Sequence, residues 1–431
     1  MSIVPVLIVS LFMFLAIGVP IGYAMGLACV LAIKLSGTTI PLMVIVQKMY
    51  TGLDSFPLMA MPFFMLAGAI MEETNIANRL LECANALIGH VKGGLSHVNI
   101  VASMFFAGIT GAATADTSAI GSVLIPAMVK DGYPIDYSAA VTAISSTIGV
   151  IIPPSMPMVI AGVTTGTSIA ALFLGGVIPG ILSGLAQLVV SVAYAKKHNM
   201  PARPGVPLAS QARLLFTNLP ALGMPFIIIG GIMAGVFTPT EASVIAVIYG
   251  FVVGCLIEKK LPSLAQMGNM LTKVSATVSV VLLCLATATT FGWLLGIAHL
   301  PASIARIIFS ITDNPVVIKL LMIVTFLIVG TFMDQVPAIL IFGPIFLPIV
   351  RNLGMSPVHF GVVIVFAMAI GLVTPPVGSV LYVVCGITGL DMLSVTRELI
   401  PFLVAVIIVL IAITFIPELV LWLPNRVLLG R

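Results

Sequence analysis

Five long stretches of the sequence contain no Asp, Glu, Lys or Arg. They cover residues 1–33, 137–195, 214–240, 274–305 and 352–390. Each is long enough for a helix of roughly 20 residues that crosses the hydrocarbon core of a bilayer, and none alternates polar and apolar residues as membrane β-strands do. Charged residues make up 7% of the 431-residue chain, against roughly 25% in soluble domains. We therefore predict an all-α polytopic membrane protein, and the net charge of +4 excludes nucleic-acid binding as its main activity.

An internal repeat further constrains the architecture. Eight glycines and prolines of the first half recur 222 residues later as Gly108/Gly330, Gly121/Gly343, Pro126/Pro348, Gly132/Gly354, Gly149/Gly371, Pro153/Pro375, Pro154/Pro376 and Pro179/Pro401. Self-similarity at a fixed spacing indicates two copies of one structural unit. We expect the first copy over 1–195, a cytoplasmic linker over 196–213 and the second copy over 214–431.

Each copy is predicted to contain the same elements in the same order. Three scaffold helices are followed by an amphipathic arm, a re-entrant hairpin of two short helices, a helix interrupted by paired prolines, and a closing helix. These elements are expected at 3–73, 74–92, 95–130, 134–168 and 171–196, and again at 214–298, 300–313, 315–351, 356–388 and 394–417. Because five crossings per copy is an odd number, the second copy is expected to be inverted relative to the first. The bias of positive charges toward the cytoplasmic side then places both termini in the periplasm.

Two of these elements are predicted in more detail. The third scaffold element is expected as an amphipathic stretch followed by a separate long apolar helix, at 38–52 and 55–73 in the first copy and at 262–273 and 276–298 in the second. The first hairpin is expected as apolar helices over 95–109 and 118–129, joined by the polar tip TGAATADT. The second hairpin is expected to turn at GTFMDQ.

Inverted repeats with hairpins and interrupted helices are typical of secondary transporters. Where a helix is interrupted, free carbonyl groups can bind a cation and free N–H groups can bind an anion. Asp116 and Asp334 lie at the two predicted tips, and an aspartate at membrane depth is a functional candidate. The alternative is that each caps the second helix of its hairpin, accepting N–H bonds from Thr117 and Ser118 or from Val336. Nearby Ser and Thr hydroxyls suit Na⁺, which prefers oxygen ligands, or else they only hydrogen-bond along and between helices.

Several long motifs make the resemblance to a known family specific. They are GITGAATADTSAIGSVLIPAMVKDGYP (108–134), SSTIGVIIPPSMPMVIAGV (145–163), GVFTPTEAS (235–243) and IGLVTPPVG (370–378). Together they resemble the large membrane subunit of the tripartite ATP-independent periplasmic (TRAP) transporters, the DctM-like family, along essentially the whole chain. The resemblance implies an elevator-type fold similar to that of the dicarboxylate/sodium symporters.

The same resemblance implies a function. Such proteins import acidic organic solutes, of the sialic acid or C4-dicarboxylate class, across the bacterial inner membrane, driven by a sodium gradient and without a cofactor. Overall resemblance favours the sialic-acid branch slightly. A periplasmic binding protein delivers the solute, and a small four-helix membrane subunit packs beside the large one among the lipids. Because the sequence starts directly at the first copy, we expect the small subunit on a separate chain.

Matching the family motifs to this sequence assigns the site residues. The first sodium site would comprise Thr110, Gly111, Asp116, Ser145 and Pro153, and the second Gly330, Thr331, Asp334, Thr374 and Pro375. We expect the solute between the two tips, near Thr117, Ser118, Ser155 and Ser379. One alternative is a stand-alone ion-coupled carboxylate symporter or antiporter. Another is an intramembrane aspartyl hydrolase, which requires the two aspartates to lie within hydrogen-bond reach of each other.

Overall fold

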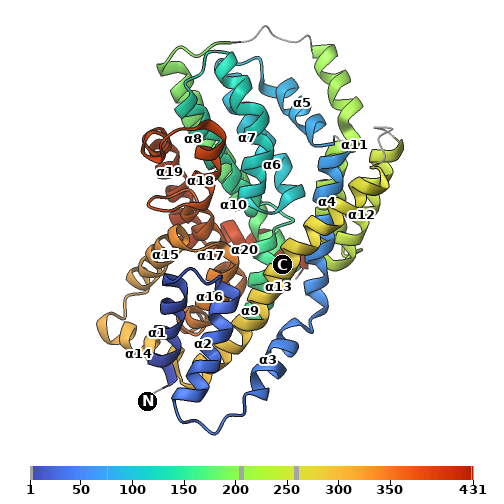
Figure 1. Ribbon diagram of the computed structural model, residues 1–431. Coiled ribbons are helices and arrows are strands. Elements are labelled where there is room, and N and C mark those ends of the chain that lie inside the picture. Colours follow the sequence, from blue (N-terminus) through green and yellow to red (C-terminus); the bar gives the residue numbers. More distant parts are fainter. Residues whose placement is uncertain (1–2, 75, 203–207, 257–261, 429, 431) are drawn as a thin grey trace.

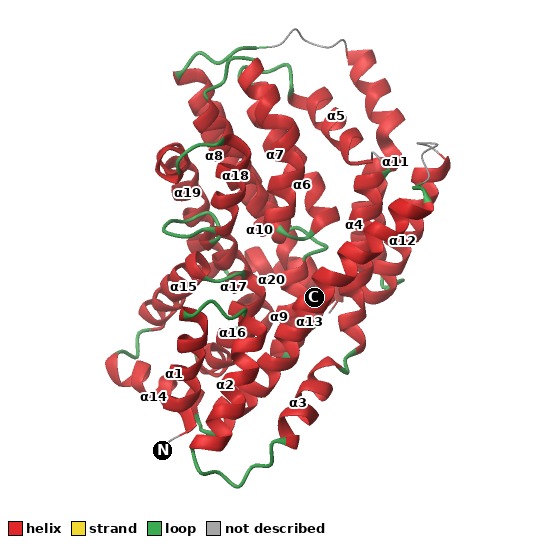
Figure 2. Ribbon diagram, viewed as in Figure 1, coloured by secondary structure: helices red, strands yellow, loops and turns green. Residues whose placement is uncertain are grey.

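The protein is helical throughout the part of the chain that its structure describes. The computed structural model describes residues 3–74, 76–202, 208–256, 262–428 and 430, and its regular secondary structure there is entirely helical (Figure 2). Some helical side chains are outside the description, those at positions 77, 78, 107–110, 208–210, 212, 213 and 215. Within the described ranges, eight helices are long and apolar enough to cross a membrane. The chain is a multi-pass α-helical membrane protein.

The order of the helices is clear along the chain (Figure 1). The first half contains α1 (Ile3–Ala16), α2 (Ile21–Leu35), α3 (Met43–Leu53), the 3₁₀ turn η1 (Phe56–Met59), α4 (Ala60–Glu73), α5 (Ile76–Ile88), α6 (Gly94–Thr110), α7 (Ala113–Lys130), α8 (Ile135–Ser145), the 3₁₀ turn η2 (Ser146–Val150), α9 (Met156–Thr165) and α10 (Ile169–Lys197). The second half contains α11 (Leu208–Met233), α12 (Pro239–Leu256), α13 (Leu264–Ile297), α14 (Leu300–Ile311), α15 (Pro315–Phe332), α16 (Gln335–Asn352), α17 (Pro357–Gly371), α18 (Ser379–Thr388), α19 (Met392–Phe415) and α20 (Glu418–Leu428).

The third scaffold element differs between the two halves. In the first half, Asp54 and Ser55 separate α3 from η1, which contains Pro57 in its first turn. In the second half, α13 is a single helix of 34 residues that starts at a capping box between Ser263 and Gln266. The predicted division between 262–273 and 276–298 is wrong, because the junction at 273–276 (KVSA) has no Pro or Gly to interrupt the helix.

The two hairpins turn more tightly than the polar tip sequence suggests. The first turns at Gly111 and Ala112 alone, and Gly111 ends α6 with a left-handed φ of 59°. The rest of the predicted tip, which is rich in Ala, continues as the first turn of α7. Asp116 therefore lies within α7, and its predicted position in the turn is corrected. The second hairpin turns at Met333 and Asp334.

Both proline pairs interrupt a helix. After α8 the chain tightens into η2 and then runs without helix through Pro153 and Pro154 to α9. Seven non-helical residues around Pro375 and Pro376 separate α17 from α18. Both Pro–Pro bonds are cis. The C-terminal helix α20, which the sequence patterns did not predict, packs against α10.

Helices from the two halves pack against each other at several places. On one side of the molecule α4 packs on α12, and α13 packs on α2 and α3. In the remainder α7 packs on α18, and α16 packs on α9, so that each hairpin contacts the interrupted helix of the opposite half. The amphipathic helices α5 and α14 lie at opposite ends of the view in Figure 1. This arrangement places each hairpin tip beside the helix interruption of its own half.

Candidate cation site at the hairpin tips

The first hairpin tip is in direct contact with the helix interruption of its own half. A Cβ atom added to Gly111 would lie 3.1 Å from the Pro154 carbonyl oxygen and 3.2 Å from the Met156 nitrogen. Only a residue without a side chain permits this approach and the left-handed backbone at the same time. The structure thus brings together Gly111 and the Pro153–Pro154 segment.

Asp116 is the most unusual side chain of this tip. It is 0% exposed, and neither of its carboxylate oxygens has a hydrogen-bond partner. The carboxylate faces Gly149 of η2, because a Cβ atom at Gly149 would lie 3.7 Å from both Cγ and Oδ2 of Asp116. The capping alternative is wrong for Asp116, since the N-cap of α7 is Ala112. A buried carboxylate without hydrogen bonds is strongly unfavourable unless a cation or proton compensates its charge.

A chain of buried hydrogen bonds lies beside Asp116. Ser103 of α6, which is close enough to the Asp116 carboxylate to interact with it, donates to Ser145 Oγ at 3.0 Å. Ser145 donates to Asn99 Oδ1 at 3.0 Å, and Asn99 Nδ2 donates to Thr142 Oγ1 at 2.7 Å. Of these residues sequence reasoning found Ser145 but missed Asn99 and Ser103. Their spacing of four residues, which places both on one face of α6, was the available signal.

The remaining residues assigned to this end of the site have mixed environments. The Thr110 side chain lies outside the described residues, and Ser118 is exposed. Thr117 is buried and donates to the Ala113 carbonyl at 2.8 Å. Ser155 donates to the Val150 carbonyl at 2.5 Å and accepts from Met158 N at 3.3 Å, which caps α9. The hydroxyl protons of Thr117 and Ser155 are therefore used in hydrogen bonds to nearby backbone carbonyls.

The second hairpin tip also contacts the helix interruption of its own half. Gly330 lies so close to Gly371 that a Cβ atom on Gly371 would collide with the Gly330 backbone. The Gly378 N–H donates to the Thr331 carbonyl at 3.0 Å. Thr331, Thr374 and Pro375 line a cavity of about 230 Å³. Four of the five residues assigned to the second sodium site therefore lie around one junction.

Asp334 differs from Asp116 in both exposure and bonding. It is exposed, and its carboxylate accepts a 2.6 Å hydrogen bond from Gln335 N as the N-cap of α16. The capping alternative is thus confirmed for Asp334, with Gln335 in place of Val336 as the donor. The two aspartates have different neighbours, Gly149 of η2 for Asp116 and Gln335 N for Asp334, so nothing in these contacts supports the paired carboxylates of an aspartyl hydrolase. Ser379, at the start of α18, has a buried hydroxyl without a partner.

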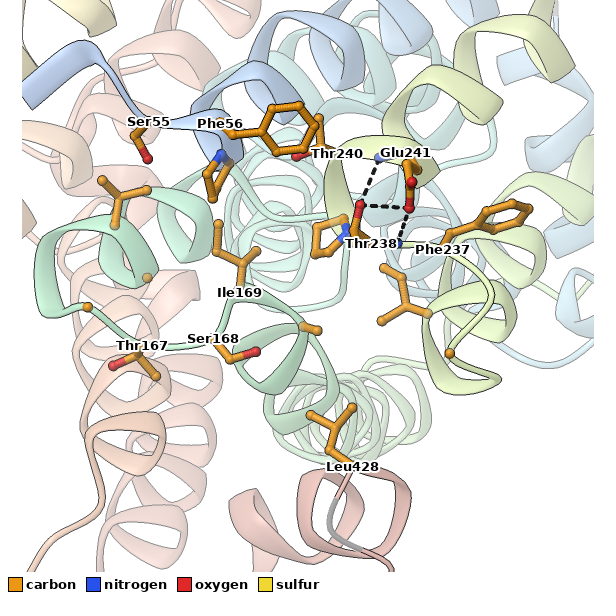
Figure 3. A pocket seen from close by; sticks show the side chains of 18 of the residues that line it. Ser55, Phe56, Thr167, Ser168, Ile169, Phe237, Thr238, Thr240, Glu241 and Leu428 are labelled. Carbon is orange, nitrogen blue, oxygen red and sulfur yellow. Dashed lines mark hydrogen bonds between the residues drawn. The ribbon is translucent and has the colours of Figure 1, made fainter.

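One cavity lies apart from both tips. It has a volume of about 700 Å³ and is lined by the α9–α10 turn, the α11–α12 turn, η1 and Leu428 (Figure 3). Glu241 is the one carboxylate among its described lining residues, and it accepts hydrogen bonds from Thr238 N at 2.8 Å and Thr238 Oγ1 at 2.9 Å. These bonds make Glu241 a cap of α12, whereas Asp116 at the first tip has no hydrogen-bond partner, so the hairpin tips remain the better candidate site.

The fold is similar to one seen among solved structures. Among solved structures, the chain is similar to the Alcanivorax borkumensis YdaH transporter with a TM-score of 0.62, over 90% of this chain and 88% of that one, at 14% sequence identity. This likeness shows that the helices are arranged as in a membrane transporter.

The family follows from the sequence comparisons. Residues 8–419 match the family model described as the DctM component of the tripartite ATP-independent periplasmic transporter. The chain is 42% identical to YgiK of Salmonella typhimurium, over 97% of each chain. It is 38% identical to the isethionate TRAP transporter permease DctMQ of Oleidesulfovibrio alaskensis, over 96% of this chain and 65% of that one. It is 37% identical to the sialic acid TRAP transporter large permease SiaM of Vibrio cholerae, over 95% of each. The chain belongs to the DctM family of TRAP transporter large permeases.

Proposed function

We propose that this chain is the translocating subunit of a sodium-driven importer of an acidic organic solute, and that it works by an elevator movement in the bacterial inner membrane. The observation that carries the proposal is Asp116, a fully buried carboxylate with no hydrogen-bond partner beside an interrupted helix. Such a group requires a cation or a proton to compensate its charge at membrane depth, and in this proposal the compensating ion is Na⁺. Membership of a transporter family supplies the context in which that cation is the coupling ion.

The element boundaries support two copies of one unit. Adding 222 to the bounds of α7 (113 and 130) gives 335 and 352, the bounds of α16. The helix contacts are repeated with the same shift of 222 residues. The packing of α7 on α18 in one place corresponds to that of α16 on α9, and the packing of α4 on α12 corresponds to that of α13 on α2. The opposite placement of α5 and α14 in Figure 1 supports inversion of the second copy, with both termini periplasmic. In this proposal α6–α10 and α15–α19 move against the scaffold α1–α4 and α11–α13.

Two sodium sites fit the two tips. At the first, Asp116 supplies the charge, and Ser145 with the free carbonyls around Thr110, Gly111 and Pro153 supplies neutral oxygens. At the second, the hydroxyls and carbonyls around Gly330, Thr331, Thr374 and Pro375 supply the ligands, with Asp334 as a nearby negative charge. Sodium bound at both tips would make the region between them favourable for an anion.

The solute is proposed to bind between the tips, near Thr117, Ser118, Ser155 and Ser379. Relatives named for isethionate and for sialic acid support an acidic organic solute. A periplasmic binding protein and a small membrane subunit complete the transporter in this proposal, which the description of the family as tripartite supports. DctMQ is longer than this chain, so the small subunit is either a separate chain, as proposed here, or part of one polypeptide.

Reconstitution tests the proposal. The chain is placed in proteoliposomes with its small subunit and binding protein, and uptake of sialic acid, isethionate and a C4-dicarboxylate is followed with an inward sodium gradient or with choline in its place. We expect uptake of one of these acids with sodium only, and only with the binding protein. Uptake in choline would contradict sodium coupling, and undiminished uptake without the binding protein would favour the stand-alone symporter.

A further inference from the structure

Two cavities adjoin each other between the proposed scaffold and the proposed moving part. The outer one is the cavity of about 700 Å³ in Figure 3, and an inner one of about 390 Å³ lies beside it. Ser55 and Val163 line both cavities, so the two meet at these side chains. Small-molecule sites have volumes of about 300–1,000 Å³, so each cavity can hold a small solute. We call the two cavities together the seam.

The walls of the seam come from both parts of the proposed elevator. In the outer cavity, η1 and the α11–α12 turn belong to the scaffold, whereas the α9–α10 turn belongs to the moving part. In the inner cavity, α3 and α13 form the scaffold wall, whereas α9 and α16 form the moving wall. A movement of one part against the other therefore changes the width of the seam.

The outer end of the seam opens at the surface of the chain. Phe56 and Val236, which line it, are each 64% exposed. In the proposed topology this end faces the periplasm. The reason is that α10 ends and α11 begins at the proposed cytoplasmic linker 196–213, whereas the outer cavity is lined by the opposite ends of these two helices.

The inner end of the seam approaches the hairpin tips. Leu340, which lines the inner cavity, follows the tip residue Asp334 by six residues, which is about 9 Å along α16. Thr164 of α9 lines the same cavity, and its buried hydroxyl has no hydrogen-bond partner. Such a hydroxyl can donate to a polar solute or to water in the cavity.

Polar groups occur along the whole seam. The outer cavity contains the hydroxyl groups of Thr167, Ser168 and Thr238, and the inner cavity those of Thr51, Thr164 and Thr289. A passing organic acid can therefore exchange hydrogen bonds to water for hydrogen bonds to hydroxyl groups. The carboxylate of Glu241 at the outer cavity is held in place by its two hydrogen bonds to Thr238.

We propose that the seam is the entry route by which the solute passes from the periplasmic surface to the hairpin tips, with Ser55 and Val163 at the constriction between the two cavities. The binding protein releases the solute into the outer cavity. Because each wall belongs to a different part, the route is open in one position of the moving part only. This inference rests on the proposed function and adds the place where the solute enters.

A thiol placed at the constriction tests the route. Ser55→Cys is reconstituted with the small subunit and the binding protein in proteoliposomes, and the membrane-impermeant reagent 2-sulfonatoethyl methanethiosulfonate is added outside. Binding protein added outside drives only those molecules whose periplasmic side faces outward, and these are the molecules that the reagent reaches from that side. We expect the bulky adduct at Cys to abolish uptake, and saturating solute to slow its formation.

Two controls accompany the measurement. Wild-type protein, treated in the same way, reports any effect of the five native cysteines. Ser310→Cys is the matched variant, because Ser310 is an exposed serine of α14 outside the seam. It should react with the reagent, as intact mass shows, and should retain its uptake.

The outcomes separate the route from the proposed function. If untreated wild-type protein shows no sodium-dependent uptake, the proposed function fails. If wild-type uptake depends on sodium but Ser55→Cys does not react, or reacts and keeps its uptake, only the route is overturned. Equal loss of uptake in Ser310→Cys overturns the route as well. Should Ser55→Cys not fold, Val163→Cys on the opposite wall of the constriction decides by the same readings.

Discussion

The two hairpin tips share a backbone plan but differ in the placement of their aspartates. Positions 222 residues apart pair Ala112 with Asp334, and both residues are N-caps of the second hairpin helix. The same spacing pairs Asp116 with Ala338, and both residues are 0% exposed. The aspartates therefore occupy different positions of the repeated unit. Asp334 is the last residue of the hairpin turn and is exposed, whereas the carboxylate of Asp116 is buried in the interior of the protein.

The region behind each tip differs in the same way. The first half places Asn99, Thr142 and Ser145 there, and the residues 222 positions later are Leu321, Ile364 and Ala367. Ser103 corresponds to Thr325, whose hydroxyl donates to a carbonyl of its own helix, that of Leu321, at 2.8 Å. The comparison indicates that the interrupted helix is common to both halves, while a charged site with a polar interior belongs to the first half alone.

Asp116→Ala tests this difference where the expected effect is largest. Loss of the only buried carboxylate of the site should raise the half-saturating sodium concentration by roughly 100-fold or more, since leaving a buried ion without its partner charge costs about 3–5 kcal/mol. The unfolding temperature should stay the same or rise, because the variant no longer buries an unpaired charge. Sodium titration of uptake and thermal unfolding of the purified protein measure both. Full transport with normal sodium dependence would show that Asp116 is not a cation ligand.

The sequence supported a large part of the fold because its strongest signals are local. Charge-free stretches marked the membrane helices, and the proline pairs at 153 and 375 marked the two interruptions. The different environments of Asp116 and Asp334 could not be predicted from such local patterns. Whether TGAATADT forms a turn or a helix depends on Gly111 fitting against Pro154, and the contact of Asn99 with Thr142 depends on α6 packing against α8. Such contacts join residues far apart in the sequence and leave no local pattern.

A pair of glycines at matching positions sharpens the comparison at a smaller scale. Gly371→Ala should destabilise the protein by about 1–3 kcal/mol, because the new Cβ collides with the backbone of Gly330. Gly149→Ala should leave stability within about 1 kcal/mol, since the atoms nearest to its Cβ belong to Asp116 at an ordinary 3.7 Å. The Gly149→Ala methyl group should instead weaken sodium binding by covering the carboxylate. Thermal unfolding should therefore detect mainly Gly371→Ala, and sodium titration should detect mainly Gly149→Ala. Equal changes in both variants would mean that the two junctions have the same function.

Substitutions at Asp334 should give the smallest effects. Asp334→Ala removes the side-chain acceptor for Gln335 N and should cost about 0.5–2 kcal/mol of stability. Asp334→Asn keeps a capping oxygen and should cost almost nothing, because Asn and Asp are equally good N-caps. In both variants the half-saturating sodium concentration should rise by no more than about threefold, since a carboxylate that already caps a helix at the surface of the chain contributes little to a neighbouring cation. A large loss of sodium affinity in Asp334→Asn, with stability unchanged, would instead make Asp334 a direct ligand and the two tips equivalent in function despite their different geometry.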